Sequence, residues 1–356
     1  MPVSSGNRRS NTVHRFVQPA AESFRAAQLR PVDISVDAEG TEEQAKILIG
    51  ISSCLVGEKV RFDGGHKQNR YILDTLGQYF SYRPFCPEVA IGLGIPRETI
   101  RLAAIDDRIE AIGNKHTKLN FTRPLIQVAE EQVNWQRCLF GYIVKKDSPS
   151  CGMERVKIYR GDLAKREGVG LYTATLMRNF PTLPVEEEGR LGDPVLRESF
   201  VKRVFIYKRW HELLARGLDW AGLTDFHARH KLILYSHNQE LGRELGRELA
   251  ASHQQPVGDY AAKYLAQLMN ILKISAKRSN HVNVLEHIRG YLKQNLDKSD
   301  KQELTESIEN YRRGLLPLIV PITLLRHHFR RNPHDYIERS YYLQPHPDEL
   351  MLLNSL

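Results

Sequence analysis

Three cysteines constrain this chain most, because each stands where an apolar segment gives way to a turn. Cys54 follows the apolar run 46–52, Cys86 follows 80–85, and Cys151 lies in a Ser- and Pro-rich turn after 140–145. Short apolar runs of this kind predict buried strands. The carboxyl ends of parallel strands meet at one edge of a sheet, where open α/β sheets bind their ligands. We therefore expect the three cysteines to converge on one site.

The alternation of strands and helices predicts the fold class. Helical patterns occupy 69–77 and 125–139, between the predicted strands. This alternation favours a Rossmann-like parallel sheet with helices on its faces, here over residues 45–196, followed by a separate all-α helical domain over 197–356. Residues 1–44 are polar in two pieces, and they predict a disordered N-terminal tail because they offer little apolar surface to bury.

The spacing of the cysteines alone leaves a second interpretation open. Intervals of 32 and 65 residues match no short metal-binding signature, and free cysteines are often packed as small hydrophobic side chains. Cys138 illustrates that alternative, because it lies in a helical run beside Trp135 and Leu139 with no polar motif around it. We predict that Cys138 is a packed thiol and not a ligand.

The residues around the other three cysteines carry a family resemblance. The segments 53–57 (SCLVG), 60–65 (VRFDGG), 85–89 (FCPEV) and 147–152 (DSPSCG) are similar, in this order, to the motifs of the TudS-type thiouracil desulfidase family. The second half resembles the YbgA-like helical domain through the run 314–325 and the ending 342–347. Together the halves resemble the RudS-type fusion, which removes sulfur from 4-thiouridine in transfer RNA.

This resemblance implies a 4Fe-4S cluster held by Cys54, Cys86 and Cys151. A cluster with three cysteine ligands keeps one iron open, and that iron can act as a Lewis acid. Glu88, two residues after Cys86, is then expected to be the general base or acid, and Ser148 is expected to offer a hydroxyl to substrate or water.

Each of these assignments has a plainer alternative. Glu88 is also compatible with a solvated loop carboxylate, and Ser148 with a turn residue before Pro149. Substrate contacts are expected from Ser53, Arg61 and Asp63, although Asp-Gly-Gly is also an ordinary turn sequence.

A modest positive charge favours a polyanionic partner, and transfer RNA is the partner that the resemblance implies. The net charge is +9, and residues 200–356 contain 23 Lys and Arg against 17 Asp and Glu. A base within folded RNA must leave its stack before an enzyme can act on it, so the helical domain is expected to hold the RNA. The predicted RNA contacts are Lys202, Arg203, Lys277, Arg278, Arg330 and Arg331. Solvated helix faces are the alternative for any one of these clusters.

Other features place the chain among cytoplasmic proteins without a membrane span. No stretch approaches the ~20 consecutive apolar residues of a transmembrane helix. Four cysteines without a secretory signal predict a reducing compartment. Two further functions stay open: the same reaction on free thiouracil or 4-thiouridine monophosphate, and a non-catalytic iron-sulfur sensor that binds RNA.

Overall fold

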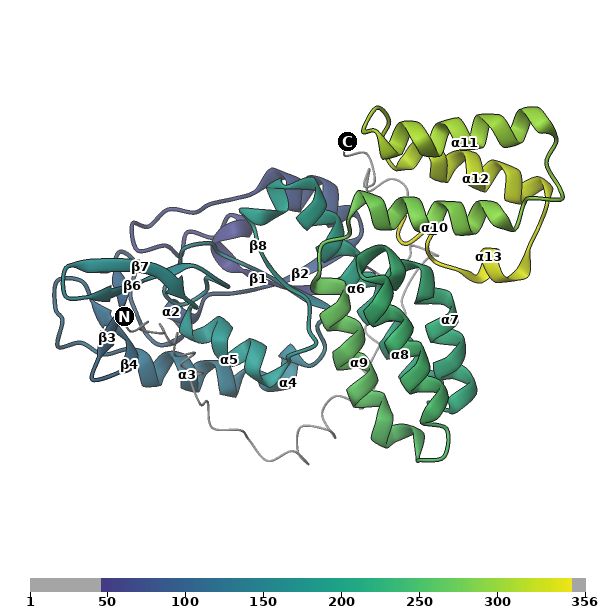
Figure 1. Ribbon diagram of the computed structural model, residues 1–356. Coiled ribbons are helices and arrows are strands. Elements are labelled where there is room, and N and C mark those ends of the chain that lie inside the picture. The colour runs from purple at the N-terminus through teal and green to yellow at the C-terminus, as the bar shows by residue number, and fades with distance from the viewer. Residues whose placement is uncertain (1–45, 348–356) are drawn as a thin grey trace, which may run out of the picture.

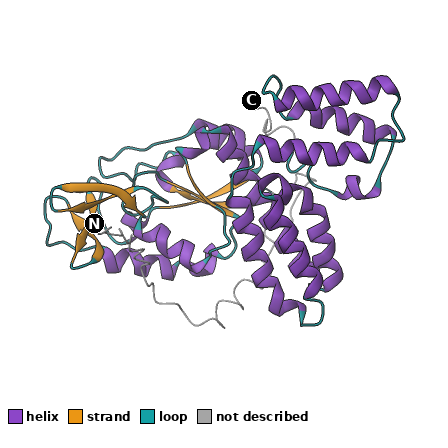
Figure 2. Cartoon of the chain, in the orientation of Figure 1, coloured by secondary structure: helices purple, strands orange, loops and turns teal. Residues whose placement is uncertain are grey.

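The computed structural model describes residues 46–347, which form an α/β half followed by a helical half (Figure 1). The tail predicted over 1–44 lies outside the described residues. In Figure 2 the strands gather in one half of the molecule, and long helices make up the other. The predicted fold class is therefore confirmed. Among residues 46–347, no helix is both long and apolar enough to cross a membrane.

A parallel sheet forms the centre of the α/β half. Its strand order is β2-β1-β5-β8, and all of its pairings are parallel. The strands are β1 (Ile47–Ser52), β2 (Phe80–Phe85), β5 (Gly141–Val144) and β8 (Val185–Glu187). The first three coincide with the predicted strands to within one or two residues. Their order places the carboxyl ends of β2, β1 and β5 side by side.

A second sheet, which the sequence did not predict, lies beside the first. Its order is β4-β3-β6-β7, with β3 and β6 parallel and the outer pairs antiparallel. The strands are β3 (Ile100–Ile105), β4 (Arg108–Gly113), β6 (Val156–Arg160) and β7 (Leu163–Gly168). Leu102, Ala111 and Val156 belong to a small apolar core of its own.

The helices of this half are short. They are α2 (Pro87–Ala90), α3 (Thr122–Glu131), α4 (Val133–Gln136) and α5 (Leu171–Asn179). The helix predicted over 125–139 begins three residues earlier and breaks at Gln132, between α3 and α4. The helix predicted over 69–77 is instead a π-helical turn (Tyr71–Thr75) followed by a 3-10 turn (Leu76–Gln78).

The helical half begins with a long helix that has a well-defined start. The side chain of Asp193 accepts the backbone N–H groups of Val195 and Leu196, and Pro194 occupies the first helical position. The helices are α6 (Pro194–Arg216), α7 (Trp220–His237), α8 (Gln239–Ala251), α9 (Val257–Lys273), α10 (Arg278–Gly290), α11 (Lys298–Arg312), α12 (Ile319–Arg331) and α13 (Asp335–Arg339).

Helix α6 packs directly on the parallel sheet (Figure 1). A Cβ atom at Gly141 of β5 would lie 2.9 Å from Val204 and 3.4 Å from Phe200, so only glycine allows this approach. The rings of Phe80 and Phe205 lie 6.3 Å apart. One apolar core consequently runs from the sheet through α6 into the helical half.

Candidate active site at the carboxyl edge of the parallel sheet

The three cysteines line one cavity of about 360 Å³. Cys54 lies in a 3-10 turn (Ser53–Val56) after β1, Cys86 lies between β2 and α2, and Cys151 lies in the turn after β5. They come together because the strands that precede them are neighbours in the sheet. Cys138 is not part of the cavity lining, and it packs against the core at the end of α4.

Burial shapes the ionisation of these thiols, and all four cysteines are free. Burial raises the pKa of Cys54 to about 11, opposed by the nearby Lys145 ammonium. Burial also raises the pKa values of Cys86 and Cys151. Negative charge on Glu88 raises the pKa of Cys86 further, and negative charge on Cys86 and Glu88 raises that of Cys151. A bound cation removes this penalty, because metal ligation favours the thiolate form.

This set of donors fits an iron-sulfur cluster better than a lone ion. Within the described residues, no group of three or more His, Cys, Asp or Glu is arranged to hold a single metal ion. In a cluster, each cysteine binds a different iron, so the thiols need only surround one cavity. Cys54, Cys86 and Cys151 meet that requirement.

The turn that carries Cys151 is held by the start of α5. The backbone N–H groups of Leu171 and Tyr172 donate to the carbonyl oxygens of Pro149 and Ser150, each at 3.1 Å. A Cβ atom at Gly170 would lie 2.5 Å from the main chain of Ser150, so this contact also depends on glycine. The first turn of α5, which has no side-chain cap, is thereby satisfied by the cysteine turn itself.

Ser148 lines the cavity and orders the same turn. Its Oγ accepts the backbone N–H of Cys151 at 3.1 Å and that of Ser150 at 3.3 Å. The hydroxyl hydrogen is not used in either bond, so it can be donated into the cavity.

Glu88 is held from two sides at the wall of the cavity. Arg97 donates to its Oε2 from Nε at 3.0 Å and from Nη2 at 2.8 Å, and the Ser150 hydroxyl donates to Oε1 at 2.5 Å. The Glu88 side chain is 16% exposed and that of Arg97 is 7% exposed. The alternative of a solvated loop carboxylate therefore does not fit Glu88.

The predicted substrate contacts divide between the cavity and its surroundings. Ser53 and Arg61 line the cavity, whereas Asp63 does not. Asp63 lies 3.5 Å from the Arg61 Nε and accepts the N–H of Gly65 at 3.0 Å. Its environment matches the ordinary turn that its sequence also allowed.

Two further charged residues at this edge were not predicted. Lys145 lines the cavity, and its Nζ forms an ion pair with Glu188. Both side chains are largely buried. The signal for Lys145 in the sequence was a lysine at the end of a predicted buried strand, because a buried charge requires a partner of opposite charge.

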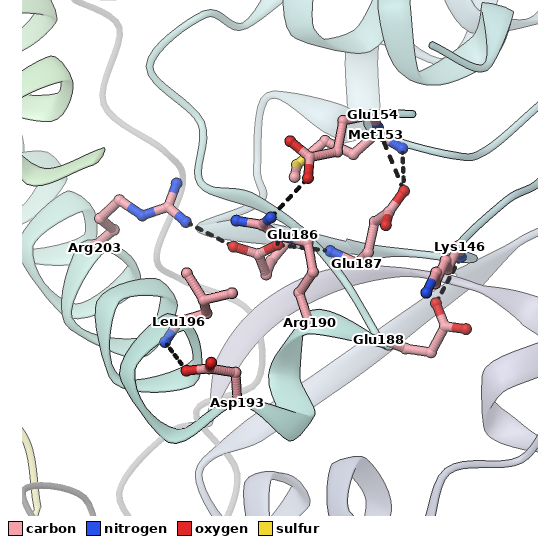
Figure 3. A network of polar contacts seen from close by, with 10 residues as sticks. All are labelled: Lys146, Met153, Glu154, Glu186, Glu187, Glu188, Arg190, Asp193, Leu196 and Arg203. Atoms are coloured by element: carbon pink, nitrogen blue, oxygen red, sulfur yellow. Dashed lines mark hydrogen bonds and ion pairs between the residues drawn. The ribbon is translucent and has the colours of Figure 1, made fainter. Parts of the chain in front are cut away.

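Three consecutive glutamates at the end of β8 organise the segments around the cavity (Figure 3). Glu187 accepts the N–H groups of Met153 and Glu154 at 2.9 and 3.4 Å, just after the Cys151 turn. Glu188 accepts the N–H of Lys146 at 2.6 Å, just before that turn. The loop that carries Cys151 is therefore fixed at both ends by one strand.

Glu186, the third of these glutamates, reaches toward the helical half. It pairs with Arg190 at 2.6 Å and with Arg203 of α6 at 3.3 Å (Figure 3). Arg203 is 6% exposed. Lys202 is 4% exposed, and its Nζ lies 3.0 Å from Glu198. The prediction of surface RNA contacts at Lys202 and Arg203 does not fit this placement, because buried carboxylates hold both cations.

The other predicted RNA contacts lie on the surface. Lys277 and Arg278 are exposed at the start of α10, and Arg330 and Arg331 are exposed at the end of α12. Figure 1 shows these two helix ends at opposite ends of the same helical group. The two basic pairs therefore form separate patches.

Comparison with known proteins gives a separate family match in each half of the chain. Residues 49–188 match the family model described as 2-thiouracil desulfurase. Residues 231–347 match a family model described as a protein of unknown function, DUF1722.

Two individual proteins match one half each. The protein YbgA of Escherichia coli (strain K12) is 32% identical over 159 residues, which are 44% of this chain and 94% of YbgA. The solved structure of the [4Fe-4S]-dependent thiouracil desulfidase TudS is 31% identical, with 43% of this chain and 99% of TudS covered and a TM-score of 0.35. The chain therefore belongs to the YbgA family through its helical half, and it carries a domain of the 2-thiouracil desulfurase family ahead of that half.

Proposed function

We propose that this protein is an iron-sulfur-dependent desulfidase that converts 4-thiouridine in transfer RNA to uridine. The observation that carries the proposal is one cavity that combines three free cysteines with a fixed carboxylate, in a domain of the 2-thiouracil desulfurase family. In the reaction, water supplies the oxygen that replaces sulfur, and the sulfur leaves as hydrogen sulfide. Atoms and electrons balance without an external oxidant or reductant.

Cys54, Cys86 and Cys151 are the residues that would hold a 4Fe-4S cluster. With only three protein ligands, such a cluster supplies an iron that acts as a Lewis acid toward a soft thiocarbonyl sulfur. Among the described residues, only these three thiols line the cavity, and Cys138 packs against the core elsewhere, which supports this ligand set.

Glu88 and Ser148 are the residues to which we assign proton handling. Glu88 takes a proton from the water that adds at C4 of the pyrimidine, a task for a carboxylate within hydrogen-bond reach of that water. Arg97 keeps the carboxylate oriented. Ser148 Oγ donates a hydrogen bond to the substrate and keeps its hydrogen. The proton on Glu88 leaves with the departing sulfur, and the second water proton passes from the C4 hydroxyl to the sulfide as the carbonyl forms.

The helical half supports RNA as the substrate. It carries the larger share of the net positive charge, and Lys277, Arg278, Arg330 and Arg331 are exposed to solvent. Exposed cations of this kind bind the phosphate backbone without regard to sequence. Ser53 and Arg61, inside the cavity, are then the contacts for the extracted nucleotide.

The test is a desulfidation assay on anaerobically reconstituted protein. Transfer RNA that contains 4-thiouridine is incubated with the protein, while the long-wavelength absorbance of the thionucleoside and the released sulfide are followed together. We expect stoichiometric loss of absorbance and release of sulfide, faster on transfer RNA than on 4-thiouridine monophosphate. RNA binding without sulfide release from the cluster-loaded protein would contradict the proposal and indicate a sensor.

A free thiopyrimidine is the second candidate substrate. The description of the matching family, 2-thiouracil desulfurase, favours it. Competition separates the two: unmodified transfer RNA should inhibit the reaction on free 2-thiouracil if both use the same surface. A reaction on free 2-thiouracil that is faster than that on RNA and insensitive to RNA would favour the small substrate.

A further inference from the structure

A second polar cavity, of about 190 Å³, lies in the helical half and has no part in the proposed reaction. It opens where α6, the end of α7, the start of α10 and α11 meet. The side chains that matter are Glu198 and Lys202 of α6, His237 at the end of α7, and Arg278 at the start of α10.

His237, which lines this cavity, has an unused polar atom. It is 2% exposed, and its Nδ1 lies 2.5 Å from the carbonyl oxygen of Ile274. Because a carbonyl oxygen only accepts, Nδ1 carries the ring hydrogen. Burial, reinforced by the nearby Lys202, lowers the pKa of His237 to about 3, so the ring is neutral and Nε2 is an acceptor. Nε2 has no hydrogen-bond partner. A buried atom of this kind calls for a ligand that donates.

The charges around the cavity leave one cation uncompensated. Lys202 and Glu198 form an ion pair at 3.0 Å, with side chains 5% and 12% exposed, and therefore cancel. Arg278 lies over the ring of Tyr311 at 5.7 Å and has no carboxylate partner within residues 46–347. The cavity therefore has a formal charge of +1.

The start of α10 adds to this positive end. Lys277 is the N-cap residue of this thirteen-residue helix, and no side chain caps its first N–H groups. Ala276 and Arg278, on either side of the N-cap, both line the cavity. An uncapped helix start attracts anions through its free N–H groups and its dipole.

We propose that this cavity binds a phosphomonoester group as its singly protonated monoanion. The P–OH hydrogen would be donated to His237 Nε2, and the remaining oxygens would accept from Lys202, Arg278 and the first N–H groups of α10. The single negative charge balances the +1 of the cavity. A carboxylate or a sulfate carries no such hydrogen at neutral pH. A phosphomonoester has a second pKa of about 6, so about a tenth of it is still the monoanion at pH 7 and can bind in that form.

The first test compares inorganic phosphate with sulfate by titration calorimetry on the full-length protein. We expect phosphate to bind at least tenfold more tightly than sulfate. Arg278→Gln should weaken phosphate binding at least tenfold, because it removes the uncompensated cation from an exposed position where folding is not at risk. Lys277→Gln is the matched control, since Lys277 is adjacent and exposed but does not line the cavity. Equal binding of both anions, or an equal loss in both variants, would overturn the proposal.

Two sources of the group are then distinguished with the same variants. Uridine 5′-monophosphate is compared with uridine, and an RNA with a 5′-phosphate is compared with the same RNA bearing a 5′-hydroxyl. A phosphate-dependent gain that Arg278→Gln abolishes only for the mononucleotide assigns the site to a small ligand, and one abolished for the RNA assigns it to an RNA end. No dependence on the phosphate in either pair would refute the site. None of these measurements involves sulfur, so their outcome is separate from that of the proposed reaction.

Discussion

Ser150 forms hydrogen bonds both to Glu88 and to the start of helix α5. Its hydroxyl donates to Glu88, and its carbonyl oxygen accepts from the start of α5. Because Cys151 is the next residue, the carboxylate and one thiol of the cavity are positioned by the same turn. Ser150 is fully buried, as such a role requires.

Single-cysteine variants test the ligand set. Replacing Cys54, Cys86 or Cys151 with alanine is expected to abolish cluster assembly, because each removes one of three protein ligands. Cys138→Ala is expected to retain it. Iron content and the visible absorbance of anaerobically reconstituted protein measure both. A cluster that survives Cys86→Ala but is lost in Cys138→Ala would overturn the assignment.

Arg97 tests the orientation of the carboxylate. Arg97→Gln should lower the rate of sulfide release about tenfold or more with unchanged iron content, because hydrogen bonds to charged groups are worth about 1.5–3 kcal/mol. Arg101→Gln is the control, since its guanidinium lies over Tyr159 at 5.2 Å and outside the cavity. Equal rates in the two variants would show that Arg97 does not act through Glu88.

At the scale of elements, the strands that precede the three cysteines were predictable and the other strands were not. β1 and β5 are apolar runs that end at turns, and β2, in which only Phe80 is buried, ends at the Cys86 turn. β7 is almost entirely exposed and rich in charge, and β8 contributes only three residues, two of them glutamates, so neither carries a strand signal. The helix also breaks at Gln132 without a Gly or Pro there, so the sequence gives no signal for this break.

The exposure of the two cations of α6 could likewise not be predicted from the sequence alone. Lys202 and Arg203 suggested a basic surface, but whether a charge is exposed depends on its partners. Glu198, four residues before Lys202, was a visible partner at helical spacing, whereas Glu186 is distant in sequence. The three cysteines and Glu88 could be predicted because they lie at the same edge of the sheet. The position of Lys145 at a strand end was a signal, but its partner Glu188 could not be identified because their pairing requires the folded sheet.

Glu187 tests whether β8 positions the cysteine loop. Glu187→Ala leaves the N–H groups of Met153 and Glu154 without their acceptor, at a cost of about 1–3 kcal/mol, and should speed the loss of iron to a chelator. Glu187→Gln keeps an acceptor oxygen and should restore slow loss. Glu154→Ala is the surface control, since it removes only a partner of Arg190. If the Gln variant loses iron as fast as the Ala variant, the backbone bonds do not hold the loop.

At the scale of the whole molecule, buried histidines make the helical half sensitive to acid. Burial lowers the pKa of His211 and His227 to about 4 and that of His230 and His237 to about 3, from an ordinary value of 6.5. The folded state keeps these rings neutral in a range where the unfolded chain protonates them. Their contribution to stability is therefore complete above pH 6.5 and is lost as the pH falls from there toward 3 to 4.

Urea unfolding at a series of pH values measures this effect. Between pH 6.5 and about 5, where carboxylates remain ionised, the free energy of unfolding should fall with a slope that steepens toward about 1.4 kcal/mol per pH unit for each such histidine. His211→Phe should reduce the slope if it folds, and His327→Phe, which changes an exposed ring, should not. A flat profile down to pH 5 would contradict the buried neutral state.

The packing of α6 on the parallel sheet also determines how the two halves of the chain can be separated. The boundary between the two halves lies within one continuous apolar core. Asp193, the N-cap of α6, follows a 3-10 turn (Arg190–Gly192) directly, so no linker separates the halves. A recombinant fragment that ends before Pro194 would present Gly141 and its apolar neighbours to water, and it should precipitate or require a solubilising substitution. Exchange of the helical half for another domain would have to bring α6 along, or redesign the face of the sheet that α6 covers.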